Sequence, residues 1–212
     1  MAGQRGHIPL AVKVPYTLFL CALVPTYWRG HGAANFLWFC DIALITLLLA
    51  MWLESALLAS MTAVGVLWTS IGWNLDFFTG ATLLGMVGYM FDPAVPLHLR
   101  AMSLFHVALP VLPLWMVHRL GYDRRAFAAQ SVLMALVLLA TYLLSDPAVN
   151  INWTFGLDRP QDVMHPLVYL LLLALGVALL ICLPAHLLLQ LVFDREAPAQ
   201  EGWREHSWNK EN

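Results

Sequence analysis

Long apolar stretches separated by short polar breaks run along most of the chain, from Pro15 to Phe193. A bilayer core about 30 Å thick takes about 20 apolar residues per helix. Six stretches reach or approach that length, namely residues 8–28, 33–54, 55–75, 99–119, 126–145 and 166–192. The pattern therefore predicts an all-α membrane bundle of six transmembrane helices.

Two stretches of this pattern allow more than one assignment. The apolar stretch 33–75 is too long for one span, and its only polar break is Glu54-Ser55. Because Ser55 can cap a new helix, we expect a tight helical hairpin there. The stretch 77–91 is short and interrupted by glycines, which favours an interfacial or re-entrant segment over a seventh span. No repeat divides the rest, so we expect one transmembrane domain over 1–193 and a polar cytoplasmic tail over 194–212.

Composition supports a membrane protein and excludes several other classes. Hydrophobic residues make up 60% of the chain and charged residues 11%, whereas soluble proteins carry about a quarter charged residues. The formal net charge of −2 gives no basic patch for nucleic acid. Cys21, Cys40 and Cys182 lie in apolar runs without a CxxC pair, so they predict neither a disulfide framework nor a zinc site. We predict no metal or cofactor.

The basic residues predict the orientation, because Lys and Arg are enriched on cytoplasmic flanks. With both termini inside, the outer side holds only Arg29, Arg100 and Arg159. The inner side then holds eight basic residues: Arg5, Lys13, Arg119, Arg124, Arg125, Arg195, Arg204 and Lys210. This bias predicts that both termini are cytoplasmic.

Asp41 and His106 are unusual because each lies inside an apolar run. A carboxylate in a spanning helix costs about 2.5–3.5 kcal/mol on insertion scales, so it usually faces a partner or a water-filled cavity. Counted at 1.5 Å per residue from the expected outer helix ends, Asp41 is about 12 Å deep and His106 about 10 Å deep. The similar depths predict an outward-opening polar site within the membrane.

Other polar and aromatic residues are expected near the same level. Pro110 removes the helical hydrogen bond to the His106 carbonyl and bends the span, and the freed carbonyl then needs a partner. The candidate binding residues are Asn35, Trp73, Asn74, Asn150, Asn152 and Trp153.

Two functional arrangements and a structural one are open. A thiol needs an adjacent base, so Cys40 with His106 would form a nucleophile–base pair. Asp41 with His106 would instead handle protons or form a structural pair. Neighbouring residues on a helix point about 100° apart, so Cys40 and Asp41 cannot face His106 equally well. In the structural alternative, Asp41 is simply hydrogen-bonded to Asn35, Asn74 or Trp73.

Four segments resemble a family of small bacterial multi-pass proteins that are usually labelled only as membrane-associated: Asn35–Asp41, Tyr89–Pro93, Ser103–His106 and Asn150–Trp153. That resemblance implies the bacterial inner membrane. More distantly, six spans with a histidine on the fourth resemble the androgen-induced membrane hydrolases, which cleave branched fatty-acid esters, and related acyltransferases. This second resemblance implies Cys40 as nucleophile and His106 as base.

Three functions are therefore compatible with the sequence. The first is a lipid-ester hydrolase or acyltransferase whose partners are the bilayer and a lipid or other hydrophobic small molecule. The second is a small transporter with a proton-coupled Asp-His pair. The third is a non-catalytic membrane scaffold subunit. The sequence predicts no oligomeric state.

Overall fold

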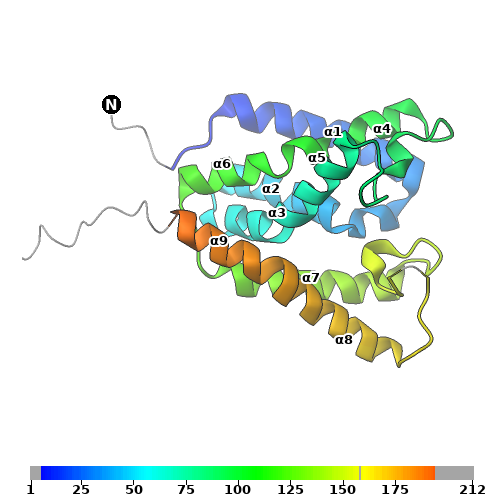
Figure 1. Cartoon of the computed structure of the whole chain (residues 1–212). Helices are drawn as coiled ribbons and strands as arrows, with labels where there is room; N and C mark the ends of the chain where they lie inside the picture. The colour runs from blue at the N-terminus through cyan, green and yellow to red at the C-terminus, as the bar shows by residue number, and fades with distance from the viewer. Residues whose placement is uncertain (1–5, 158, 194–212) are drawn as a thin grey trace, which may run out of the picture.

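The computed structural model describes residues 6–157 and 159–193, and within these residues the chain forms helices and loops without strands (Figure 1). The all-α prediction is confirmed. In chain order the elements are α1 (Leu10–His31), η1 (Ala33–Leu37), α2 (Phe39–Leu53), α3 (Ala56–Phe78), η2 (Gly88–Met90), α4 (Leu97–Ser103), α5 (Phe105–Ala108), α6 (Val111–Leu120), α7 (Ala126–Leu144), η3 (Ile151–Trp153), α8 (Pro166–Gly176), η4 (Val177–Cys182) and α9 (Leu183–Phe193). The predicted tail over 194–212 lies outside the described residues.

Five helical segments of the described chain are long and apolar enough to cross a membrane. They are Leu10–His31, Ala56–Phe78, Leu97–Leu120, Ala126–Leu144 and Pro166–Phe193. The remaining predicted span, the second in chain order, corresponds to α2, which is apolar but has only 15 residues.

The predicted start of the second span, at residue 33, is wrong. Residues 33–37 form the 3-10 turn η1, and Trp38 then adopts an extended conformation with φ −59° and ψ 137°. The α-helix begins only at Phe39, so Asp41 lies in its first turn. The count of 1.5 Å per residue from residue 33, on which the predicted depth of about 12 Å rests, therefore does not apply to residues 33–38.

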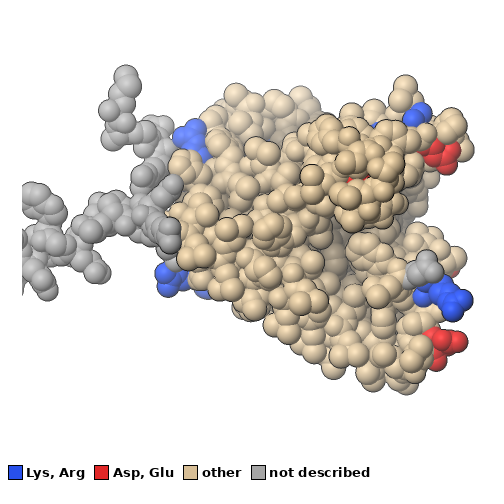
Figure 2. Space-filling view, in the orientation of Figure 1, with Lys and Arg blue, Asp and Glu red and all other residues tan. Residues whose placement is uncertain are grey.

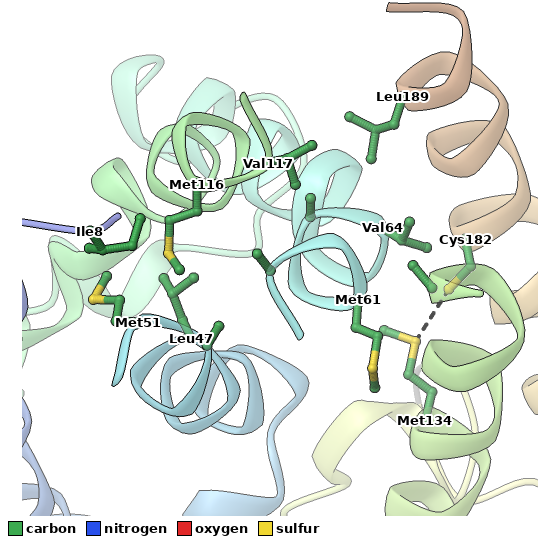
Figure 3. Packing of buried hydrophobic residues seen from close by; sticks show 14 residues of the cluster. Ile8, Leu47, Met51, Met61, Val64, Met116, Val117, Met134, Cys182 and Leu189 are labelled. Atoms are coloured by element: carbon green, nitrogen blue, oxygen red, sulfur yellow. Dashed lines mark hydrogen bonds between the residues drawn. The ribbon is translucent and has the colours of Figure 1, made fainter. Parts of the chain in front are cut away.

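Helix α3 is the central element of the bundle. It packs against α2, α6, α7 and α9, and it is more buried than the other long helices. Close packing with α7 depends on Gly65, because a Cβ there would overlap the side chain of Gln130. Sulfur-containing side chains fill much of the core around α3; Figure 3 shows Met61 and Met134, with Cys182 Sγ donating to Met134 Sδ at 3.4 Å.

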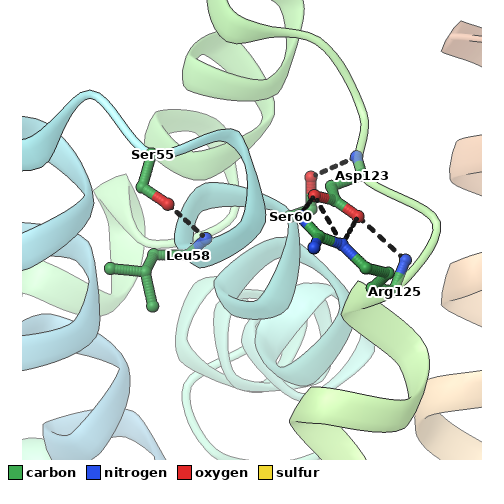
Figure 4. A network of polar contacts seen from close by, with 5 residues as sticks. All are labelled: Ser55, Leu58, Ser60, Asp123 and Arg125. Carbon is green, nitrogen blue, oxygen red and sulfur yellow. Dashed lines mark hydrogen bonds and ion pairs between the residues drawn. The ribbon is translucent and has the colours of Figure 1, made fainter.

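The hairpin predicted at Glu54-Ser55 is confirmed. Ser55 caps α3, and its Oγ accepts a hydrogen bond from the Leu58 N–H at 3.3 Å (Figure 4). Figure 4 also shows how the α6–α7 loop is fastened at this end: the Asp123 N–H donates to Ser60 Oγ at 3.0 Å. A hydrogen bond from Arg125 lowers the pKa of the Asp123 carboxyl. We call this end of the bundle the Glu54 end.

The long loops 79–96 and 145–165 lie together at the opposite end, which we call the Asn152 end (Figure 1). Asp76, fully buried at the end of α3, accepts hydrogen bonds from the N–H groups of Leu84, Gly85 and Val87 at 2.7, 3.1 and 3.0 Å. The first loop is therefore folded back against α3. The prediction that residues 77–91 do not form a seventh span is confirmed.

Two spans are interrupted. The fourth breaks at Leu104 and again at residues 109–110, as expected from Pro110. The sixth contains the π-helical turn η4 ahead of Pro184. Proline offers no N–H to the carbonyl four residues earlier, and wider π turns accommodate such local defects.

Glu54 fastens the start of the chain to the α2–α3 hairpin. Its Oε1 accepts from Lys13 Nζ at 2.6 Å and from the Ile8 N–H at 3.1 Å, and lies 2.8 Å from His7 Nδ1. Lys13 is only 6% exposed. A buried ammonium is costly without a partner, so the carboxylate of Glu54 stabilises the buried Lys13 side chain.

This contact predicts an acid-sensitive component of stability. The Lys13 hydrogen bond, followed by that of the Ile8 N–H, lowers the pKa of Glu54. A lowered folded-state pKa gives stability that is present above the unfolded-state value of about 4.3 and is lost as the pH falls through the folded-state value. In detergent, the melting temperature should fall more steeply on acidification below about pH 5 for the wild type than for Glu54→Gln. Parallel curves would contradict this assignment.

Candidate functional site

Asn152 fixes the start of α2. Its Oδ1 accepts from the Phe39 N–H at 3.1 Å, and its Nδ2 donates to the Leu37 carbonyl at 2.7 Å. The side chain is 2% exposed, and the residue has a left-handed φ of 53°. Asn tolerates this conformation better than most residues. A residue of the 145–165 loop therefore supplies the cap that α2 lacks locally.

Asp41 lies in the first turn of α2, where the helix dipole favours a carboxylate. It is 3% exposed, and its Oδ2 accepts a hydrogen bond from Asn35 Nδ2 at 3.1 Å. Its Oδ1 is buried without a hydrogen-bond partner in the described part of the chain. Half of this carboxyl group is thus bound as in the structural alternative, and the other half is buried without a partner in the described part of the chain.

A second set of polar groups lies beside α2. The hydroxyl groups of Tyr27 and Ser103 are 2.7 Å apart, and Trp73 Nε1 donates to the Tyr89 hydroxyl at 3.2 Å. Burial raises the pKa of Tyr89, hydrogen bonds with Ser103 and Trp73 lower it, and the nearby Cys40 and Asp41 raise it further. Cys40 and Asp41 are therefore within electrostatic reach of Tyr89.

His106 is held by its own helix and by aromatic rings. Its Nδ1 lies 2.9 Å from the Ser103 carbonyl oxygen, which can only accept, so Nδ1 carries the proton. The ring stacks on Trp73 at a centroid distance of 4.6 Å and on Phe105 at 4.0 Å. Among the described residues it makes no hydrogen bond with Cys40 or Asp41, so neither proposed pair is formed directly here.

Asn74 is the partner of the carbonyl that Pro110 frees. Its Nδ2 donates to the His106 carbonyl at 2.8 Å and to the Ser70 carbonyl at 2.8 Å. The interruption in the fourth span is thereby joined to α3. This contact shows that the polar side chain of Asn74 has a structural role beside the site.

Asn150 and Trp153 lie in the loop that carries Asn152. Asn150 Nδ2 donates to the Gly156 carbonyl at 2.7 Å, and its Oδ1 accepts from the Phe155 N–H at 2.9 Å. The Trp153 carbonyl accepts from the Tyr169 hydroxyl. Both residues therefore shape the loop, whereas Asn35, Trp73, Asn74 and Asn152 lie at or next to the helices that surround Asp41.

Sequence reasoning missed Tyr27, Ser103 and Tyr89. Tyr27 lies near the outer end of the first predicted span, at the level expected for the site, and this position was the available signal. Its aromatic ring looked like an ordinary membrane-interface residue. Within the described residues no group of three or more His, Cys, Asp or Glu side chains could hold a metal ion.

An apolar groove of about 350 Å³ opens between α1, α2 and the interrupted fourth span. Its walls include Tyr16, Phe19, Leu44, Leu47, Phe105 and Ala108. The Tyr16 hydroxyl donates to the Leu44 carbonyl at 2.9 Å, so the polar atom of this wall is satisfied. Leu44 lies one helical turn from Asp41. The groove and the polar cluster are therefore neighbours along α2.

These features define an all-α protein with several helices able to cross a membrane and a buried polar cluster beside an apolar groove. No family model, curated protein or solved structure matches the chain. The resemblances to the membrane-associated family and to the androgen-induced hydrolases therefore stay predictions.

Proposed function

We propose that the chain is a six-span protein of the bacterial inner membrane that binds an amphipathic lipid from the outer side. The hydrocarbon chain occupies the groove, and the polar end lies at Asp41. The observation that carries this proposal is the Asp41 Oδ1, which is buried without a partner one turn from an apolar groove. Such an oxygen is costly in the membrane, and a polar ligand would satisfy it.

The short helix α2 supports the placement of Asp41. Its 15 residues span about 22 Å, less than the hydrocarbon thickness of about 30 Å. If its Glu54 end lies at the inner interface, its start is recessed below the outer interface. A lipid entering sideways through the groove would then meet Asp41 without crossing the headgroup region.

The distribution of charge supports the orientation. Among the described residues, the Glu54 end carries Lys13, Arg119, Arg124 and Arg125, and the Asn152 end carries Arg29, Arg100 and Arg159 (Figure 2). Acidic side chains gather with the basic ones at the Asn152 end in this view. The positive-inside rule then supports a cytoplasmic Glu54 end in this proposal.

Hydrolysis or acyl transfer is the chemistry that we propose for this site. An ester bond between the chain in the groove and a polar group at Asp41 would lie near Cys40 and Phe105. His106, with its proton on Nδ1, presents an unprotonated Nε2 for the role of base. To act as the base, the His106 ring would have to move out of its stacked position, because it is hydrogen-bonded to neither Cys40 nor Asp41 here. We do not propose a transporter, because the two interrupted spans are the fourth and sixth and not counterparts in two halves.

Photolabelling in liposomes tests lipid binding. The probes are palmitic acid and its glycerol monoester, each with a diazirine in the chain. We expect at least one probe to label peptides from α1 and from α4–α6 in preference to the lipid-facing helix α8. Ala108→Trp fills the groove and should reduce this labelling several-fold, whereas Leu171→Trp on the exposed face of α8 should not. Even labelling of all lipid-facing helices by both probes, unchanged by Ala108→Trp, would contradict the proposal.

A further inference from the structure

Resting on the proposed function, we infer that the polar end of the bound lipid is a hydrogen-bond donor without negative charge, a hydroxyl group or an amine. The site would thus accept a monoacylglycerol, a long-chain alcohol or a long-chain amine and reject a fatty acid or a lipid phosphate. The kind of headgroup that the cluster can accept depends on which of its hydrogen-bonding positions are already filled.

Several donors of the cluster around Asp41 already have partners. Asn35 Nδ2 donates to Oδ2 of Asp41, and Trp73 Nε1 donates to the Tyr89 hydroxyl. Ser103 Oγ is shared between the Tyr27 hydroxyl and the Leu99 carbonyl, and Tyr89 hydrogen-bonds the same side chain. The position left open is Asp41 Oδ1, which can only accept when the carboxyl group is ionised. The ligand must therefore supply the proton of the hydrogen bond.

The Arg100 side chain on the fourth span is tied to the 79–96 loop. Its Nη1 donates to the Met90 carbonyl at 3.1 Å, whereas its Nε is buried without a hydrogen-bond partner in the described part of the chain. No ion pair joins Asp41 to a basic residue among the described residues, where the recorded pairs are those of Glu54 and Asp123. A second anion placed beside Asp41 would thus meet an uncompensated like charge in a medium of low polarity.

The hydrogen bond to Oδ1 and the repulsion between like charges both favour a donor headgroup over an anionic one. A hydroxyl or amine completes a hydrogen bond to a charged group, and such bonds contribute about 1.5–3 kcal/mol. A carboxylate or phosphate offers no proton and adds repulsion. We expect at least a tenfold preference for the donor headgroup, the change that 1.4 kcal/mol produces in an equilibrium constant.

Competition for photolabelling measures this preference. Unlabelled monopalmitoylglycerol, hexadecylamine and palmitic acid compete with the labelled monoester at a mildly alkaline pH, at which the acid is ionised. We expect the monoester or the amine to displace the label at a concentration at least tenfold below that of palmitic acid. Whichever of the two competes better identifies the donor as hydroxyl or amine.

Variants at Asp41 assign the preference to its charge. Asp41→Asn can donate as well as accept and carries no charge, so it should remove most of the discrimination against palmitic acid. Cys21→Ser on the exposed face of α1 is the control and should keep it. The melting temperature of each variant shows whether it is folded. If Asp41→Asn does not fold, the order in which the three competitors displace the label from the wild type decides whether the headgroup preference exists. Equal or better displacement by palmitic acid in the wild type would overturn this inference and leave lipid binding intact. Absence of groove labelling by either probe would overturn the proposed function itself.

Discussion

Replacement of Asn152 by alanine is expected to destabilise the folded protein by on the order of 3 kcal/mol. The change leaves the Phe39 N–H and the Leu37 carbonyl without their partner, and each unpaired buried group costs about 1–3 kcal/mol. Alanine is also less tolerant than asparagine of the left-handed φ of 53°. Thermal unfolding in detergent, followed by circular dichroism, measures the loss.

Asn152→Gly separates the two causes. Glycine adopts the left-handed conformation without strain but restores neither hydrogen bond, so its melting temperature should lie between those of the wild type and Asn152→Ala. A Cys21→Ser background adds a local readout, because alkylation of Cys40 should become faster once the start of α2 is no longer capped. Wild-type stability and alkylation in Asn152→Ala would contradict this role for the cap.

Replacement of Asn74 by leucine is expected to be the second most disruptive change, at about 1–3 kcal/mol for one unpaired buried carbonyl. The His106 carbonyl would lose its 2.8 Å hydrogen bond and has no helical donor at Pro110. The expected result is a lower melting temperature and weaker photolabelling of the groove, since the fourth span lines it.

The proline offers a specific rescue. Pro110 already has helical angles of φ −75° and ψ −29°, so Pro110→Ala should supply an N–H to the His106 carbonyl without a change of conformation. The double variant Asn74→Leu/Pro110→Ala should recover most of the stability that Asn74→Leu loses. Additive effects of the two substitutions would show that Asn74 acts through something other than this carbonyl.

Features that depend on local sequence could be predicted. The long apolar stretches predicted the helices, Ser55 caps α3 as expected from its place after Glu54, and Pro110 interrupts the fourth span. Each of these follows from residues within one or two turns. The need of the His106 carbonyl for a partner was predictable for the same reason.

Features that depend on tertiary contacts could not be predicted from the sequence. The start of α2 is set by Asn152, which lies 113 residues from Phe39 along the chain. Tyr27 and Ser103 are 76 residues apart, and neither is unusual in its own span. The identity of Asn74 as the partner of the freed carbonyl depends on how α3 packs against α5. The sequence therefore predicts a candidate site from the polar residues Asp41 and His106 in apolar runs, whereas the hydrogen-bond partners of that site depend on the tertiary fold.

Asp41 connects these observations to function. Asn152 fixes the helix start that carries it, and Asn35 binds one of its oxygens. Asn35 and the helix dipole stabilise the carboxyl group, but they leave Oδ1 without a partner in the described part of the chain. The neighbouring groove provides the space from which a lipid would reach it.

The most direct test of lipid binding is an experimental structure of the protein purified from native membranes in a mild detergent. We predict elongated density along the groove beside Leu44 and Phe105, with its polar end at hydrogen-bonding distance, about 2.7–3.2 Å, from Oδ1 of Asp41. A groove closed by its own side chains, with Oδ1 bonded to a protein group, would contradict the account.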